Sequence, residues 1–417
     1  MYFTGFTCVS CQRVYRPDQD LLLCPACDNL LEAQYDLARL GRDVDRDALA
    51  RRPATVWRFA ELLPVLDPGK IVTLGEGGTP LLRSDRLARE CGVRELWIKT
   101  DAANPTGSLK DRSITVSATK ALEFGYGVLS CDSTGNKASS TAAYAARAGL
   151  RSVVFCPYET PLPKAAQAVF FGAELIRVRS HYSAINAMYR QLIRSGRVRW
   201  YDCGTDNPFR YEGKKTYAYE IAQDLGWRAP DHVLHPIAGG MSLVKTWKGF
   251  NEMRALGWVE RVPRMAGVQA QVCAPIVEAW ERAETVVKGI EKRPSVASAL
   301  GVADPGLLGT RCLETIRASG GAAAGVTDDE ILNAVRALGR EGLFVEPSGA
   351  VTLAGLPRLV RSGHIDREAS VVCVVTGSGF KDFEAIARMV SIPERAVTTY
   401  DEMVAAATGL SSDGTPR

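Results

Sequence analysis

Asn104-Pro-Thr-Gly-Ser-Leu-Lys-Asp-Arg112 is a turn rich in Pro and Gly that leads into a helix predicted over residues 113–125. Ser108 or Thr106 can cap this helix, so Lys110 stands where a turn meets a helix. A lysine at such a junction can be buried. Burial lowers the pKa of an amine, and a neutral amine can attack an aldehyde and form a Schiff base. Most lysines are solvated instead, so the prediction for Lys110 depends on the rest of the chain.

The same stretch resembles the lysine motif of threonine synthases, which reads Asn-Pro-Thr-Gly-Ser-Phe-Lys-Asp-Arg and differs only at Leu109. Threonine synthases are pyridoxal phosphate enzymes. Further blocks resemble this family in the same order, namely Trp57–Pro64, Leu74–Leu81, Ser133–Asn136, Asn207–Thr216, Trp247–Phe250, Gly267–Ala270, Glu346–Ser348 and Thr376–Asp382. Together they cover most of the chain, and the resemblance implies a related fold and the same cofactor.

Size and charge exclude several function classes. The chain has 417 residues with 46% hydrophobic content, enough for the cores of two or three domains. Its 51 basic and 47 acidic residues give a net charge of only +4, so we expect neither a nucleic-acid nor a membrane partner. The sequence contains no apolar run that could span a bilayer and no signal-peptide pattern, so we expect a cytoplasmic protein.

Short apolar strands alternate with helices after the first fifty residues, which predicts an α/β fold with largely parallel sheets. Buried strands are predicted at residues 96–99, 152–155, 174–178, 232–236 and 371–375, and helices at 138–148, 182–195, 215–225 and 328–338. The resemblance implies a tryptophan synthase β-like fold with two open, twisted-sheet domains. We assign residues 39–109 and 207–417 to a large cofactor-binding domain and residues 110–206 to a small mobile domain.

Four cysteines near the N-terminus form two pairs, Cys8-x2-Cys11 and Cys24-Pro-Ala-Cys27, separated by twelve residues. This spacing predicts a zinc-ribbon-like lobe over residues 1–38, because four thiolates can close a tetrahedral zinc site. So short a lobe has little core of its own, and a structural metal would stabilise it. The alternatives are a ribbon without its ion and four reduced thiols. The other seven cysteines are predicted to be buried packing residues.

Each part of pyridoxal phosphate has a candidate partner. Lys110 is the Schiff-base lysine. Gly239, Gly240, Met241 and Ser242 follow a predicted strand and precede a helix, whose amides can bind the phosphate, although a Gly-Gly pair is more often a simple turn. The resemblance implies that Asn136 contacts the ring hydroxyl and that Thr376 faces the ring nitrogen. Without the resemblance, Asn136 would be a helix cap and Thr376 the start of a turn.

The substrate candidates flank these residues. The resemblance implies that the backbone of Ser133, Thr134 and Gly135 holds a substrate carboxylate. Asn207 and Arg210 are candidates for a substrate phosphate, because a guanidinium can bind it in a bidentate manner, although loop cations are usually solvated. Lys137 departs from the small polar residue that is common in the family. It can hold the leaving phosphate, select a different acidic substrate, or point to solvent.

The resemblance implies γ-elimination of phosphate from O-phospho-L-homoserine and addition of water at Cβ, which gives L-threonine. Lys137 motivates an alternative, a pyridoxal phosphate enzyme that carries out β-replacement or ammonia elimination on O-phosphoserine, serine or a related amino acid. An alternative from another class is a non-catalytic, ligand-sensing relative whose lobe binds a partner. The resemblance also implies a homodimer.

Overall fold

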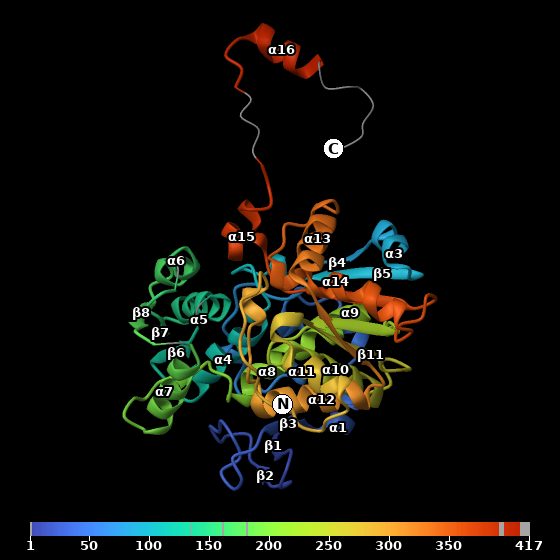
Figure 1. The fold of residues 1–417 in the computed structure, drawn as a ribbon. Coiled ribbons are helices and arrows are strands. Elements are labelled where there is room, and N and C mark those ends of the chain that lie inside the picture. Colours follow the sequence, from blue (N-terminus) through green and yellow to red (C-terminus); the bar gives the residue numbers. More distant parts are fainter. Residues whose placement is uncertain (1, 134, 161, 181, 392–395, 409–417) are drawn as a thin grey trace.

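The computed structural model describes residues 2–133, 135–160, 162–180, 182–391 and 396–408. It contains a three-stranded, a four-stranded and a six-stranded sheet, which lie in different parts of the molecule in Figure 1. In the described residues, no helix is both long and apolar enough to cross a membrane.

The six-stranded sheet has the order β12 (Ala322–Val326), β11 (Arg264–Ala270), β10 (His232–Pro236), β13 (Ser370–Val375), β5 (Glu95–Thr100) and β4 (Leu81–Arg83). All pairs are parallel except β4 with β5, so the prediction of a largely parallel sheet is confirmed.

Alternate residues of β13 belong to two different hydrophobic clusters, because successive side chains of a strand point to opposite faces. Val372 and Val374 pack with α9 (Thr216–Asp224), α10 (Met241–Ala255), α11 (Pro275–Glu281) and α12 (Gly306–Ala318). Val371 and Cys373 pack with α3 (Asp85–Cys91), α13 (Asp328–Gly339) and α14 (Pro347–Arg361). Helices therefore cover both faces, which explains why β10 and β13 are buried along their whole length.

The four-stranded sheet is parallel and has the order β8 (Glu174–Val178), β7 (Arg151–Pro157), β6 (Val128–Asp132) and β9 (Tyr201–Asp202). Around it lie α4 (Lys110–Glu123), α5 (Asn136–Arg147), α6 (Leu162–Phe170) and α7 (Tyr182–Arg194) (Figure 1). The prediction that residues 174–178 form a buried strand is wrong in one respect. β8 is an edge strand with no buried residue, because only β7 pairs with it. The predicted domain boundaries stay predictions.

The N-terminal lobe consists of β1 (Phe3–Cys8), β2 (Val14–Tyr15) and β3 (Leu31–Tyr35), which pair antiparallel. It packs on α8 (Pro208–Glu212), where the ring of Phe6 lies edge-on to Phe209 with 4.7 Å between centroids. Glu32 of the lobe also pairs with Lys245 of α10, and the Tyr35 hydroxyl donates to Glu212 at 3.0 Å. The lobe is thus joined to the body through an aromatic contact and buried ion pairs.

The remaining predicted elements agree with the structure to within a few residues. α4 begins at Lys110, three residues before its predicted start, and no side chain caps it. The other elements are α1 (Leu37–Asp43), α2 (Arg46–Leu49), α15 (Phe383–Ala387), α16 (Tyr400–Thr408) and the 3-10 helices η1 (Val56–Leu62), η2 (Pro68–Lys70), η3 (Asp101–Ala103), η4 (Gly213–Lys215), η5 (Gln271–Cys273), η6 (Ser298–Leu300) and η7 (Gly379–Asp382).

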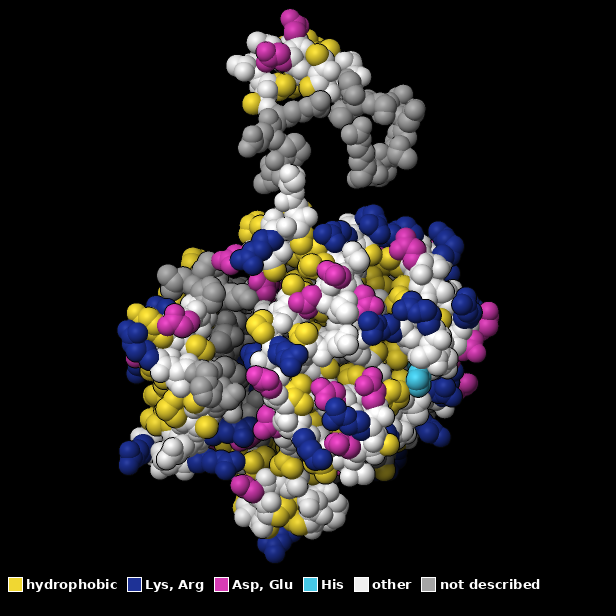
Figure 2. Space-filling view, viewed as in Figure 1, with side chains coloured by type: hydrophobic (Ala, Val, Ile, Leu, Met, Phe, Trp, Pro, Cys, Tyr) yellow, Lys and Arg dark blue, Asp and Glu magenta, His cyan; other side chains and the backbone are white. Residues whose placement is uncertain are grey.

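Surface charges are mixed. On the face drawn in Figure 2, dark-blue Lys and Arg side chains are interspersed with magenta Asp and Glu side chains, in keeping with the net charge of +4. The described part of this face therefore offers no continuous basic surface for a polyanion.

Candidate active site

The candidate site lies where parallel strands end, the usual place for ligand sites in open α/β sheets. Ser133 follows β6, Thr376 follows β13, and Gly239 follows β10 by a few residues. The turn before Lys110 is tied to the same edge, because the backbone N–H of Leu109 donates to the carbonyl of Thr376 at 2.9 Å. The structure thus brings Lys110 and Thr376 close together.

The first turn of α4 is fixed to the large sheet by Arg112. Its buried guanidinium donates to Asp101 at 2.8 Å and to Glu220 at 2.8 Å. Glu220 also pairs with buried Lys99 at 2.9 Å. Arg112 is part of the lysine motif, but the motif alone predicts no role for it. Since it lies two residues from Lys110, this network determines where α4 begins.

The amine of Lys110 lies in a positively charged environment. Burial and then the charge of Arg210 lower the pKa of Lys110 to about 8, against an opposing effect of Glu346. A much larger share of this amine is therefore neutral near pH 7–8 than in an exposed lysine, as a Schiff-base lysine requires.

Arg210 and Asn207 come from α8, and both are buried. One guanidinium nitrogen of Arg210 donates to the carbonyl of Gly204, whereas its Nε has no partner among the described residues. Asn207 caps α8, since its Oδ1 accepts from the N–H of Arg210 and its Nδ2 donates to the carbonyl of Asp202 at 2.7 Å. Its amide therefore holds the segment that carries Arg210.

Asn136 is the first residue of α5 and faces a carboxylate from the other sheet. Its Nδ2 donates to Glu346 Oε1 at 3.0 Å. Burial raises the pKa of Glu346 to about 7. Lys381 of η7 reaches in the opposite direction, donating to Ser139 of α5 at 3.1 Å and to Gln167 of α6. These contacts join the parts built on the two sheets.

A cleft of about 490 Å³ lies at this junction. It is lined by Ala102, Asn104, Pro105, Thr106, Gly107, Gly135, Asn136, Ala166, Gln167, Ser378, Phe380 and Lys381. Glu346 and Lys381 belong to motif blocks that predict no role for either residue, because the contacts that reveal their roles cross from one sheet to the other.

The segment after β6 contains Ser133 and Lys137, whose contacts differ in kind. Ser133 accepts a hydrogen bond from the N–H of Gly135 at 3.2 Å, and Thr134 lies outside the described residues. Lys137 is buried, and its Nζ lies 2.7 Å from Oδ1 of Asp132. Burial opposes ionisation of Asp132, but Lys137 and then Asn186 hold its pKa below the usual range. Lys137 therefore does not point to solvent.

The Gly239–Ser242 segment has the features of a phosphate cradle. Gly240 has φ +85°, and a Cβ there would lie 2.3 Å from the Cβ of Cys312, so only glycine fits. α10 begins at the next residue, and no side chain caps its first turn. Its first amides are therefore available to an anion. Together with the lowered pKa of Lys110, this cradle fits pyridoxal phosphate.

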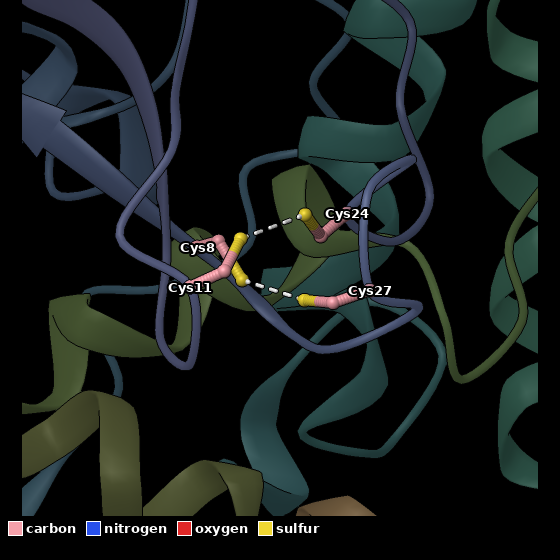
Figure 3. Close-up of side chains that lie close together, drawn as sticks. All are labelled: Cys8, Cys11, Cys24 and Cys27. Atoms are coloured by element: carbon pink, nitrogen blue, oxygen red, sulfur yellow. Dashed lines mark hydrogen bonds between the residues drawn. The ribbon is translucent and has the colours of Figure 1, made fainter.

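The four N-terminal cysteines converge on one point. Their Sγ atoms all lie within 4.8 Å of one another, with 3.4 Å between Cys8 and Cys27 and 3.6 Å between Cys11 and Cys24 (Figure 3). A tetrahedral zinc site with bonds of about 2.3 Å separates its sulfurs by about 3.8 Å. The donor set therefore fits zinc. The other seven cysteines are free and buried, as predicted.

Comparisons with known proteins agree with this geometry. A family model described as pyridoxal-phosphate dependent enzyme matches residues 72–377. The threonine synthase of Methanocaldococcus jannaschii is 41% identical over 383 residues, covering 91% of this chain and 94% of that protein. The threonine synthase of Methanosarcina acetivorans is 39% identical over 381 residues, covering 91% and 92%.

Solved structures share the fold at lower identity. The processed form of threonine deaminase isoform 2 from Solanum lycopersicum has a TM-score of 0.65 and 19% identity, covering 83% of this chain and 94% of that one. A fungal L-serine ammonia-lyase from Rhizomucor miehei has a TM-score of 0.63 and 20% identity, covering 75% and 96%.

Proposed function

The chain belongs to the threonine synthase family of pyridoxal-phosphate-dependent enzymes, and we propose that it converts O-phospho-L-homoserine and water to L-threonine and inorganic phosphate. Its sheets have the tryptophan synthase β-like arrangement of that family. The observation that carries the proposal is Lys110, a partly buried lysine whose pKa is lowered by desolvation and then by the charge of Arg210. The predicted homodimer stays a prediction.

The cofactor would be held by residues from three strand ends. Lys110 would supply the amine, the first turn of α10 would bind the phosphate, and Thr376 and Asn136 would contact the ring. Pyridoxal phosphate supplies one property, the stabilisation of negative charge on the carbon next to the substrate's amino group. A neutral hydroxyl at Thr376 in place of a carboxylate favours elimination over transamination, since it leaves the ring nitrogen less protonated.

Protons are moved by Lys110. With substrate and cofactor bound, the free amine of Lys110 would take a proton from Cα of the substrate, release it, and then take one from Cβ. The bond between Cγ and the phosphate oxygen breaks, the phosphate leaves with the bonding electrons, and the hydroxyl of water adds at Cβ. Of the three protons that come from Cα, Cβ and water, one goes to Cγ, one returns to Cα and one goes to the phosphate. Arg210, with an Nε that lacks a partner among the described residues, is the ligand that we propose for the substrate phosphate.

Closure of the cleft protects this chemistry from side reactions. Asn136 with Glu346, and Lys381 with Ser139, connect the two sides of the cleft and limit the access of water. We further propose that backbone groups of Ser133, Thr134 and Gly135 hold the substrate carboxylate. Lys137 forms an ion pair with Asp132, and this pairing weakens the argument that Lys137 selects a different acidic substrate.

The test compares two phosphorylated amino acids. Wild-type protein is expected to form threonine and phosphate in equal amounts from O-phospho-L-homoserine, and Lys110→Ala is expected to form neither. Lys70→Ala, which alters an exposed lysine, serves as the matched control and should retain activity. Faster phosphate release from O-phospho-L-serine than from O-phospho-L-homoserine would overturn the proposal in favour of β-replacement.

We also propose that Cys8, Cys11, Cys24 and Cys27 bind a structural zinc ion. The support is the convergence of four sulfur atoms in a lobe whose three short strands enclose little core. The ion would hold the two cysteine pairs of the lobe together and would take no part in the chemistry.

A further inference from the structure

Lys214 lies on the same helical surface as Arg210. α8 continues into η4 without a break, since Glu212 and Gly213 both have right-handed helical backbone angles. Residues four apart on a helix share a face, and the cationic groups of Arg210 and Lys214 both lie over the Tyr211 ring, 5.0 and 5.3 Å from its centroid. The charges of Lys110 and Arg210 are the ones that act on Lys214.

Lys214 differs from the other buried lysines in having no carboxylate partner. Six described lysines are less than 9% exposed, and five of them lie within 3 Å of a carboxylate oxygen, namely Lys99, Lys120, Lys137, Lys215 and Lys245. Lys214 is 6% exposed, yet among the described residues no carboxylate lies within ion-pairing distance of its ammonium group. Burying a charged amine without a counter-charge costs free energy of folding, and a bound anion would offset that cost.

Among the described residues, the neighbours of Lys214 supply no formal negative charge. Burial and then the cations Lys110 and Arg210 hold the pKa of Lys214 well below its usual range. His235 of β10 is also close, and burial together with Lys214 lowers the pKa of His235 to about 3. Neither ring nitrogen of His235 has a hydrogen bond with a described residue. β10 leads within a few residues to the Gly239–Ser242 cradle, so Lys214 lies close both to Arg210 and to the strand that leads to that cradle.

We propose that Lys214 is a phosphate ligand of the active site and that its ammonium group pairs with a phosphate dianion brought by the cofactor or by the substrate. If the cofactor brings the phosphate, the proposal requires only that the protein binds pyridoxal phosphate. If the substrate brings it, the proposal rests on the proposed function. In either case Lys214 weakens the stability of the empty protein and strengthens the binding of a dianion.

The first measurement separates binding from a structural role. Lys214→Met removes the charge and keeps the length, and Lys214→Arg restores a cation. Lys215→Met is the matched control, because its lysine is equally buried but is paired with Glu212 at 2.8 Å. The cofactor-free full chain is heated with and without inorganic phosphate. Lys214→Met should melt at or above the wild-type temperature, whereas Lys215→Met should melt below it.

Binding measurements then identify the source of the phosphate. If the cofactor supplies it, Lys214→Met should bind pyridoxal phosphate about tenfold more weakly or worse, with unchanged affinity for pyridoxal, which lacks the phosphate. If the substrate supplies the phosphate, Lys214→Met should bind pyridoxal phosphate with unchanged affinity. The affinity of the Lys214→Met holoenzyme for inorganic phosphate, measured by binding or by inhibition, should be about tenfold lower than that of wild type. Lys214→Arg should recover most of either loss.

Two results would overturn the proposal. One is a Lys214→Met protein that melts well below wild type, as the control does. The other is a change of less than about twofold in the affinities for both pyridoxal phosphate and inorganic phosphate. Neither measurement requires turnover of O-phospho-L-homoserine, so a failure of the proposed reaction would be recognised separately.

Discussion

Gly213 lies at the closest approach of two backbones, and Gly213→Ala tests whether that approach positions the catalytic groups. A Cβ at residue 213 would lie 1.7 Å from the carbonyl oxygen of Arg112. The backbone at Gly213 is right-handed helical, with φ −58° and ψ −24°, so alanine meets no torsional penalty there. The effect of the substitution is therefore steric.

The size of the displacement follows from this contact. Real Cβ atoms stay at least 3.0 Å from such atoms, so the segment around Gly213 must move by about 1.3 Å. Arg112 is held by Asp101 and Glu220, and α4 therefore cannot yield easily. The part that moves is the short helix carrying Arg210 and Lys214. A misplacement of about 1 Å at such groups can lower kcat/KM about a hundredfold.

The assay combines steady-state kinetics with urea unfolding. Gly213→Ala is expected to lower kcat/KM for O-phospho-L-homoserine by about a hundredfold and stability by about 1–3 kcal/mol. Gly339→Ala is the matched control, because Gly339 is also helical but a Cβ there would meet nothing within 4 Å. The control should keep full activity and gain up to about 1 kcal/mol. A Gly213→Ala enzyme within about twofold of wild type would refute this reasoning.

Three further predictions concern Glu346, Gly240 and the cysteines. The folded-state pKa of Glu346 is about 7 against 4.5 for a free carboxyl, so its contribution of about 3 kcal/mol is present below pH 4.5 and is lost as the pH rises through 7. Glu346→Gln should flatten the pH dependence of the unfolding free energy between about pH 5 and 7, and parallel curves for the two proteins would contradict this. Gly240→Ala places a Cβ 2.3 Å from Cys312 at φ +85°, and it should cost about 2–4 kcal/mol and weaken cofactor binding in an absorbance titration; unchanged affinity would argue against the cradle. A strong chelator should release about one zinc ion per chain, measured by elemental analysis, and lower the melting temperature. Cys24→Ser should copy this loss of stability, whereas Cys91→Ser, at a cysteine outside the cluster, should retain the metal.

Much of the fold could be predicted because its signals are local. β13 is a continuous apolar run after Ser370, and β10 places Val233 and Leu234 between two histidines. Both strands are buried along their whole length, and their predicted bounds agree closely with the structure. Lys110 and Arg210 were found through motifs in which neighbouring residues define the turn. The edge position of β8 could not be read in this way, because it depends on which strands pair and not on the strand's own composition.

The charge partners in the site could not be predicted from the sequence either, because they also depend on contacts between segments that are distant or reversed in the chain. The contact between Asn136 and Glu346 joins residues 210 positions apart, and the pair of Lys137 with Asp132 requires the chain to reverse between a strand and a helix. A sequence shows that Lys214 and Lys215 are both lysines. Only the packing shows that one has a carboxylate and that the other has none among the described residues.

The contacts that attach the lobe to the body determine when, during synthesis of the chain, the lobe can dock. Glu32 meets Lys248, which is 216 residues later in the chain, and Phe6 meets Phe209. The lobe leaves the ribosome before the body on which it docks, and its docking surface does not exist until Lys248 has been made. During that interval only its three strands and its four thiols can preserve its shape. The cell's supply of metal to a newly made chain would then influence how many enzymes are completed, before any substrate is met.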